Sequence, residues 1–147
     1  LVLRAKNKDT HEDLQKQFIN RKVKKSYIAL LDGWIEPDSG KIELPLRVDL
    51  DDRPRQIVCY EYGKMGVTEF KVLSKTENST RIQYFPITGR THQLRVHSAH
   101  KSGLNAPIKG DDLYGTKSNR LHLHAHTLEF FHPITKEWVS FQSNPDF

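Results

Sequence analysis

The segment from Ile87 to His97 gathers more chemically capable side chains than any other part of the chain. Its sequence, ITGRTHQLRVH, combines arginine, histidine, glutamine and threonine with few apolar residues, which is too polar for a core. The Thr-Gly turn and the helix formers after it predict a loop that opens into a short helix, whose free N–H groups favour an anion such as phosphate. Arg90 and Arg95 lie five residues apart, so on a helix they point in different directions and can serve different partners. The alternative is a solvated amphipathic helix.

The string GRTHQLRVH resembles the signature of the RluA-type pseudouridine synthases. Other segments follow in that family's order and extend the resemblance over the whole chain. They are KSYIAL at 25–30, similar to K-x-Y-x-A; DRPRQ at 52–56 with CYE at 59–61, similar to a linker in the branch that modifies ribosomal and transfer RNA; PIKGDDLYG at 107–115; and RLHLHA at 120–125.

The resemblance implies a reaction that detaches uracil from its ribose, rotates it and rejoins it through carbon, with no cofactor and no metal. An aspartate acts as the nucleophile, and a positioned group later removes a proton from carbon. Arg95 aligns with the arginine that pairs with this aspartate, and Tyr27 with the tyrosine that stacks on the base and manages a proton. Either Leu121 or Leu123 closes the other side of the base pocket.

Further residues are expected to hold the RNA. They are Lys25, Arg53, Arg55, Arg90, His92 and Gln93. Because a duplex hides the reacting atoms of the uridine, the expected partner is a loop or bulge in structured RNA, either ribosomal RNA, transfer RNA or both.

One departure from the family pattern is important. The family's nucleophile sits in an H-R-L-D-x-x-T-S-G motif, which is absent here, and the opening Leu1-Val2-Leu3 resembles the apolar strand that follows that motif. We therefore expect the nucleophile upstream of Leu1 and no activity from these 147 residues alone. Asp111 and Asp112 are substitute candidates, but a Gly-Asp-Asp turn more often bonds its own backbone.

Two other functions are compatible with parts of the sequence. The first is an RNA-binding module without chemistry. The second is a histidine-metal enzyme, because His122, His124 and His126 alternate and would share one face of a strand, with His92 or His97 as a further ligand. Tyr27, taken without the resemblance, would be an ordinary core aromatic residue.

Composition is consistent with an RNA enzyme. The net charge is +5, and residues 1–27 carry all of the excess, with eight Lys and Arg against three Asp and Glu. A basic segment of this kind suits a phosphate backbone or is simply a solvated helix face. The single cysteine, Cys59, excludes an internal disulfide and favours the cytoplasm, and no apolar run reaches membrane-spanning length. We expect one domain over 1–147, the C-terminal part of a synthase catalytic domain, and a monomer.

The expected fold is α+β: a mixed, mostly antiparallel sheet with flanking helices, truncated at its N-terminus. Helices are expected from about 7 to 20, with Leu14 and Phe18 on the buried face and a basic end at 21–25, and near 91–100. Strands are expected at 26–34, around 42, at 70–72, 81–84, 121–131 and 137–142, with a loop at 103–115.

Overall fold

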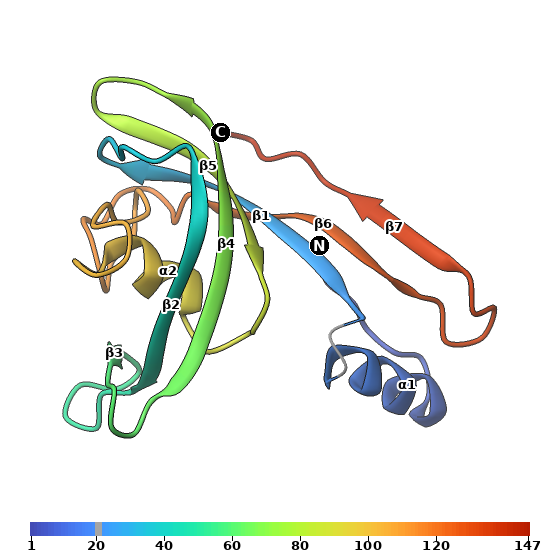
Figure 1. The fold of residues 1–147 in the computed structure, drawn as a ribbon. Helices are drawn as coiled ribbons and strands as arrows, with labels where there is room; N and C mark the ends of the chain where they lie inside the picture. Colours follow the sequence, from blue (N-terminus) through green and yellow to red (C-terminus); the bar gives the residue numbers. More distant parts are fainter. Residues whose placement is uncertain (20–21) are drawn as a thin grey trace.

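A single seven-stranded sheet organises the computed structural model, which describes residues 1–19 and 22–147 (Figure 1). The order across the sheet is β3-β2-β4-β5-β1-β6-β7, and each pairing between these strands is antiparallel. The strands are β1 (Lys24–Asp32), β2 (Ser39–Val48), β3 (Gln56–Val58), β4 (Lys64–Lys75), β5 (Ser79–Pro86), β6 (Leu123–Phe131) and β7 (Trp138–Gln142). The α+β class is confirmed, although the expected mixed sheet has no parallel pair among the described strands.

The central strand β1 determines where the site forms. It pairs with β5 on one side and β6 on the other, and apolar residues on both of its faces are buried, as the sequence predicted: Ile28 on one face, Ala29 and Leu31 on the other. Ala29 and Leu31 are completely buried, and Ile82 and Tyr84 on β5 pack in the same core. This packing leaves the N-terminal half of β1 as the partly exposed half, where Lys25 and Tyr27 lie.

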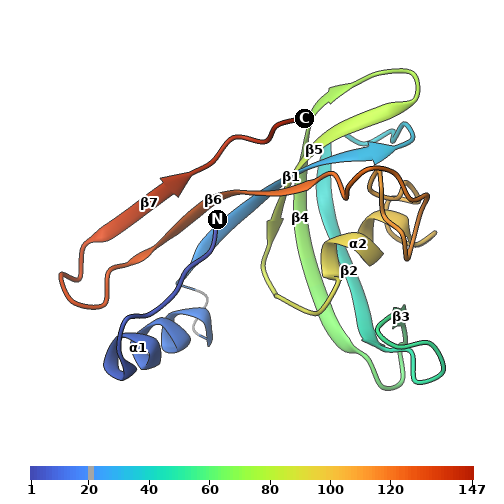
Figure 2. The same cartoon turned by 180° about the vertical axis from the view of Figure 1, so that it is seen from behind.

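The two helices lie at different ends of the sheet in both views (Figures 1 and 2). Helix α2 (Gln93–Ala99) contacts β2, β3 and β4, and buries Leu94 and Val96. The loop that follows α2 returns to the sheet through an isolated bridge between Leu31 and Ile108. The short helix and the loop expected at 103–115 are therefore confirmed.

Helix α1 (Lys8–Ile19) differs from the expectation in its buried face. Asn7 caps it, because the Thr10 N–H donates to Asn7 Oδ1 at 2.9 Å. Leu14 is buried, but Phe18 is 45% exposed, and Gln17 takes the inward position instead. Its amide exchanges two hydrogen bonds with the backbone of Phe131, at 2.6 and 2.8 Å. Tertiary hydrogen bonding thus overrides the hydrophobic pattern.

The boundaries around α1 also need correction. The expected helix end at Asn20 and the basic residue Arg21 lie outside the described residues. Lys24 and Lys25 belong to β1 and not to a basic helix end. Leu1-Val2-Leu3, expected as a strand, has no regular secondary structure, and lines a second cavity of about 420 Å³ beside β6 and β7. Neither described helix is long and apolar enough to cross a membrane.

Candidate active site

A cavity of about 290 Å³ lies between the start of β1, the start of β6 and the loop that leads into α2. It brings together seven of the residues expected from sequence. They are Lys25, Tyr27, Arg90, His92, Gln93, Arg95 and Leu123. Three expected residues do not line this cavity: Leu121 packs against the hydrophobic core, and Arg53 and Arg55 lie in the β2–β3 loop.

Two side chains form the flat and apolar part of the cavity. Tyr27 on β1 pairs with Ala125 on β6, and Ala29 pairs with Leu123, so Tyr27 and Leu123 are close neighbours on adjacent strands. Tyr27 is half-buried, and burial raises the pKa of its phenol. It therefore keeps its proton at neutral pH. Of the two leucines left open by the sequence, Leu123 lines the cavity and Leu121 does not.

Lys25 brings a positive charge to the same cavity. Burial lowers the pKa of its ammonium group, and its Nζ lies 5.6 Å from the centre of the Phe18 ring. Within the described ranges, no carboxylate forms an ion pair with it. An anionic ligand in the cavity would offset this burial cost.

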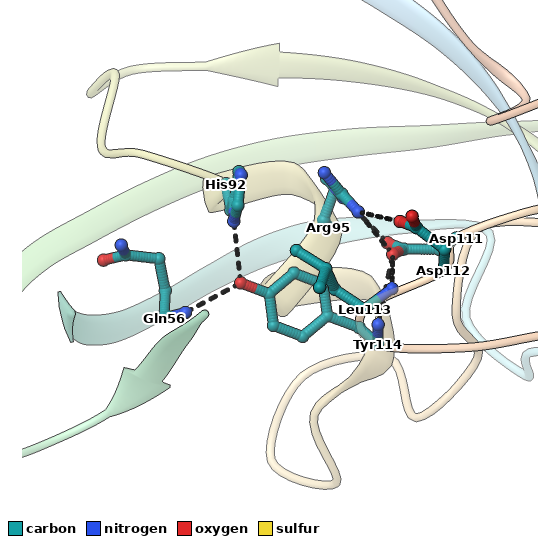
Figure 3. A network of polar contacts seen from close by, with 7 residues as sticks. All are labelled: Gln56, His92, Arg95, Asp111, Asp112, Leu113 and Tyr114. Atoms are coloured by element: carbon teal, nitrogen blue, oxygen red, sulfur yellow. Dashed lines mark hydrogen bonds and ion pairs between the residues drawn. The ribbon is translucent and has the colours of Figure 1, made fainter. Parts of the chain in front are cut away.

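Arg95 is held along one edge by the loop after α2 (Figure 3). Its Nε donates to Asp111 Oδ2 at 3.0 Å, and its Nη2 donates to Asp111 Oδ1 at 2.7 Å and to Asp112 Oδ1 at 3.2 Å. No hydrogen bond to another described residue uses Nη1. The guanidinium therefore has a fixed orientation and an unused pair of donors.

Asp111 is completely buried, and its Oδ1 also accepts the N–H groups of Leu113 and Tyr114 at 3.0 and 3.1 Å. Burial opposes ionisation, but Arg95 and the two N–H groups outweigh it and hold the pKa of Asp111 below its usual value. These contacts confirm that the Gly-Asp-Asp turn bonds its own backbone. They also leave Asp111 poorly suited to act as a nucleophile.

Gln93 was expected to contact RNA, but its side chain forms hydrogen bonds within the protein. Its Nε2 donates to Val67 O at 2.9 Å and to Thr68 Oγ1 at 2.8 Å, while its Oε1 accepts from Thr88 Oγ1 at 2.6 Å and from the Arg90 N–H at 3.0 Å. These four bonds use the full capacity of the amide. The Arg90 N–H, which the loop-to-helix pattern predicted to be free for a phosphate, therefore already has an acceptor. Gln93 therefore holds the loop in shape.

His92 occupies the turn into α2 with a left-handed backbone, φ 54°. Its Nδ1 lies 2.8 Å from the Tyr114 hydroxyl. Burial lowers the pKa of the imidazole, and the positive charge of Arg95 lowers it further. His92 is thus neutral at physiological pH.

The remaining arginines point outward. Arg90 is exposed and donates through Nε to Met65 O at 3.0 Å, so Arg90 and Arg95 do serve different partners, as their spacing predicted. Arg55 pairs with Asp52 at 2.9 Å and lies 5.4 Å from the centre of the Tyr114 ring, while Arg53 is exposed. Arg53 and Arg55 form a separate surface near the cavity rather than part of it.

The alternating histidines are used for structure. His124 and His126 lie within hydrogen-bond distance of Ser143, at 3.1 and 2.8 Å, and His122 lies near the carbonyls of Lys109 and Arg120. Across the described part of the chain, no three His, Cys, Asp or Glu side chains form a group able to hold a metal ion. The histidine-metal alternative therefore has no site in this part of the chain.

Sequence reasoning missed two residues of the site, Asp111 as the holder of Arg95 and Tyr114 as the neighbour of His92. In the sequence, the GDDLYG string indicates only a family motif with two candidate nucleophiles. An aspartate followed by a turn was a usable signal for backbone bonding, but nothing local indicated that the loop folds back onto α2.

Comparison with known proteins identifies relatives over the whole chain. A family model described as RNA pseudouridylate synthase matches residues 1–100. The dual-specificity RNA pseudouridine synthase RluA of Pasteurella multocida (strain Pm70) is 45% identical, over 100% of this chain and 68% of its own length. The protein of the same name from Haemophilus influenzae (strain ATCC 51907 / DSM 11121 / KW20 / Rd) is 40% identical, over 100% and 68% respectively.

A solved structure, human RNA pseudouridylate synthase domain containing 1, superposes with a TM-score of 0.82 at 30% identity. The superposition covers 97% of this chain and 63% of the human chain, so the chain spans somewhat under two thirds of that relative. The match in sequence, fold and motif order leads to one conclusion. The chain belongs to the RNA pseudouridylate synthases, isomerases that act on RNA, and is of the RluA type.

Proposed function

We propose that the cavity receives one uridine turned out of a loop or bulge of ribosomal or transfer RNA, and that the intact protein isomerises this uridine to pseudouridine there. The observation that carries the proposal is the meeting of Tyr27 and Leu123 with Lys25, His92 and Arg95 around one cavity of about 290 Å³. A flat aromatic face and a branched aliphatic side chain suit the two faces of a base, and the polar groups suit its edges and phosphates.

Tyr27 is the proposed stacking residue. Its phenol enters the reaction protonated, because burial raises its pKa, so it first acts as a hydrogen-bond donor. It becomes able to accept the proton released from carbon only after its own proton has left. Leu123 closes the opposite side of the base.

Arg95 is the proposed partner of the nucleophilic aspartate. Asp111 accepts hydrogen bonds from Nε and Nη2, which leaves Nη1 free to donate to a second carboxylate. A guanidinium held in this way would keep the nucleophile ionised and aimed. Lys25 adds positive charge to the same cavity.

The other basic residues are proposed to contact RNA outside the base pocket. Arg90 lies at the cavity rim, and Arg53 and Arg55 extend the contact surface toward the β2–β3 loop. Gln93 is proposed to position the 88–90 loop and not to bind RNA directly, because its amide is fully used.

The RNA substrates, the location and the oligomeric state are also part of the proposal. The printed name of the bacterial relatives, dual-specificity RNA pseudouridine synthase, favours more than one RNA substrate, and the DRPRQ segment favours ribosomal and transfer RNA. A cytoplasmic location and a monomeric state remain predictions from the single cysteine and from the expected single domain.

A second function, RNA binding without chemistry, is favoured for the 147 residues taken alone. Asp111 is the carboxylate that contacts Arg95 most closely, and it already bonds Arg95 and two backbone N–H groups.

The proposed isomerase function is tested by pseudouridine mapping in total RNA from cells that lack the gene, with and without the intact protein. Loss and recovery at discrete loop uridines supports the proposal, and an unchanged map refutes it.

A further inference from the structure

The tyrosine of the loop after α2 contacts two other segments of the chain through its hydroxyl and its ring (Figure 3). The Tyr114 hydroxyl accepts the N–H of Gln56, the first residue of β3, at 2.8 Å, and lies 2.8 Å from His92 Nδ1. Its ring centre is 5.4 Å from the guanidinium carbons of both Arg55 and Arg95. Three separate segments of the chain thus meet at one side chain.

The hydrogen bonds around the phenol determine which way its proton points. Because the Gln56 N–H already donates to the phenol oxygen, the phenol proton needs an acceptor of its own. Within the described residues, His92 Nδ1 is the acceptor at hydrogen-bond distance. If Nδ1 carried a proton instead, the phenol oxygen would accept two N–H groups and its own proton would have no partner.

This arrangement determines the protonation of the other imidazole nitrogen, Nε2. A neutral histidine that accepts at Nδ1 carries its proton on Nε2, and no described residue hydrogen-bonds to His92 Nε2. Burial raises the pKa of the Tyr114 phenol, so this residue stays a donor at neutral pH. His92 also lines the cavity.

We propose that Tyr114 is a positioning residue that fixes His92 as the neutral Nε2–H tautomer, so that His92 presents one N–H donor to an oxygen of the RNA nucleotide in the cavity. The contact of His92 with RNA rests on the proposed function, whereas the tautomer is a property of the free protein. Two measurements therefore test the two parts separately.

The first measurement is the ¹⁵N spectrum of the histidine side chains in the intact, RNA-free protein at neutral pH. His92 should show a protonated Nε2 and an unprotonated Nδ1, and Tyr114→Phe should give a mixture of tautomers and a higher His92 pKa. The matched control is Tyr62→Phe, since the exposed Tyr62 ring lies 5.5 Å from Arg47 in a similar cation–π contact. An Nδ1–H tautomer in the unsubstituted protein, or an unchanged His92 spectrum in Tyr114→Phe, overturns the inference.

The second measurement compares steady-state kinetics on RNA. Tyr114→Phe should raise KM severalfold with a smaller change in kcat, and it should add nothing further in a His92→Ala background, because that variant has no imidazole for Tyr114 to orient. Additive effects of the two changes overturn the coupling. If His92→Ala itself leaves KM unchanged while the spectrum is as expected, the RNA contact of His92 is wrong and the tautomer assignment stands.

Discussion

Arg95 and Asp111 form a bidentate ion pair in which the carboxylate is completely buried and the guanidinium faces the cavity. The pair joins helix α2 to the loop at 110–115, and so it fixes the orientation of the proposed partner of the nucleophile. An uncompensated charge would remain if either member were removed.

The first prediction concerns this pair. Asp111→Asn should lower the free energy of unfolding by about 3 kcal/mol, because it leaves Arg95 partly buried without its charge partner. Asp112→Asn is the control, since its side chain is 62% exposed and should change stability by less than about 1 kcal/mol. Urea denaturation measures both, and equal effects of the two changes would contradict the structural role of Asp111.

The second prediction separates the two arginines of the signature. In the intact enzyme, Arg95→Lys should reduce kcat by about 100-fold, because lysine lacks the planar fork that engages two carboxylates. Arg90→Lys should chiefly weaken RNA affinity and leave its salt dependence nearly unchanged, because lysine keeps the positive charge. Single-turnover rates and salt-dependent binding distinguish the effects. The reverse pattern would show that the two roles are exchanged.

The third prediction uses the two leucines at the start of β6. Leu121 and Leu123 both pack against the core, so replacing either with alanine should cost about 2 kcal/mol of stability. Only Leu123→Ala should also reduce kcat/KM, by about tenfold, since Leu123 lines the cavity. A larger kinetic effect at Leu121 than at Leu123 would show that the base does not lie against Leu123 in this cavity.

The fourth prediction is a pH dependence set by His97. This side chain is completely buried, its Nε2 has no hydrogen-bond partner among the described residues, and burial lowers its pKa to about 4. Its Nδ1 lies 2.9 Å from Thr68 Oγ1, the same hydroxyl that accepts from Gln93. Protonation of His97 would therefore disturb the bonds that hold the 88–90 loop.

The unfolded chain binds a proton at this histidine at a higher pH than the folded protein does. The contribution to stability is therefore complete above pH 6.5 and is lost as the pH falls toward 4, by about 1.4 kcal/mol per pH unit. An NMR titration of the imidazole checks it directly. A midpoint near 6.5 in the folded protein would contradict the prediction.

Local patterns in the sequence were enough to predict most of the strands. Apolar residues on both faces of β1, and alternation in β4 and β5, fixed these elements because strand periodicity is a local property. The same reasoning failed at Phe18, where the position expected to be buried is exposed and Gln17 replaces it. That outcome depends on a hydrogen bond to Phe131, which lies 114 residues away.

In the site, too, local patterns predict some features and long-range contacts determine the others. The residue types that surround the cavity could be predicted from the signature segment and its family resemblance, but the partners of these residues could not. Gln93 has the donors of an RNA-binding residue, yet it bonds Val67 and Thr68 on β4. Asp111 and Tyr114 act on α2 only because the loop folds back over it, and no short-range pattern encodes that contact.

The most direct test of the central claim, that this cavity serves a nucleophilic carboxylate other than Asp111 and Asp112, is pseudouridine formation measured on RNA with two proteins. An intact protein that carries an H-R-L-D motif should form pseudouridine, and should lose this activity when the aspartate of that motif is replaced by asparagine. The 147-residue chain should bind RNA and form none, because Asp111 is committed to Arg95 and to its own backbone. Pseudouridine formed by the 147-residue chain alone would contradict the claim and would make Asp111 or Asp112 the nucleophile.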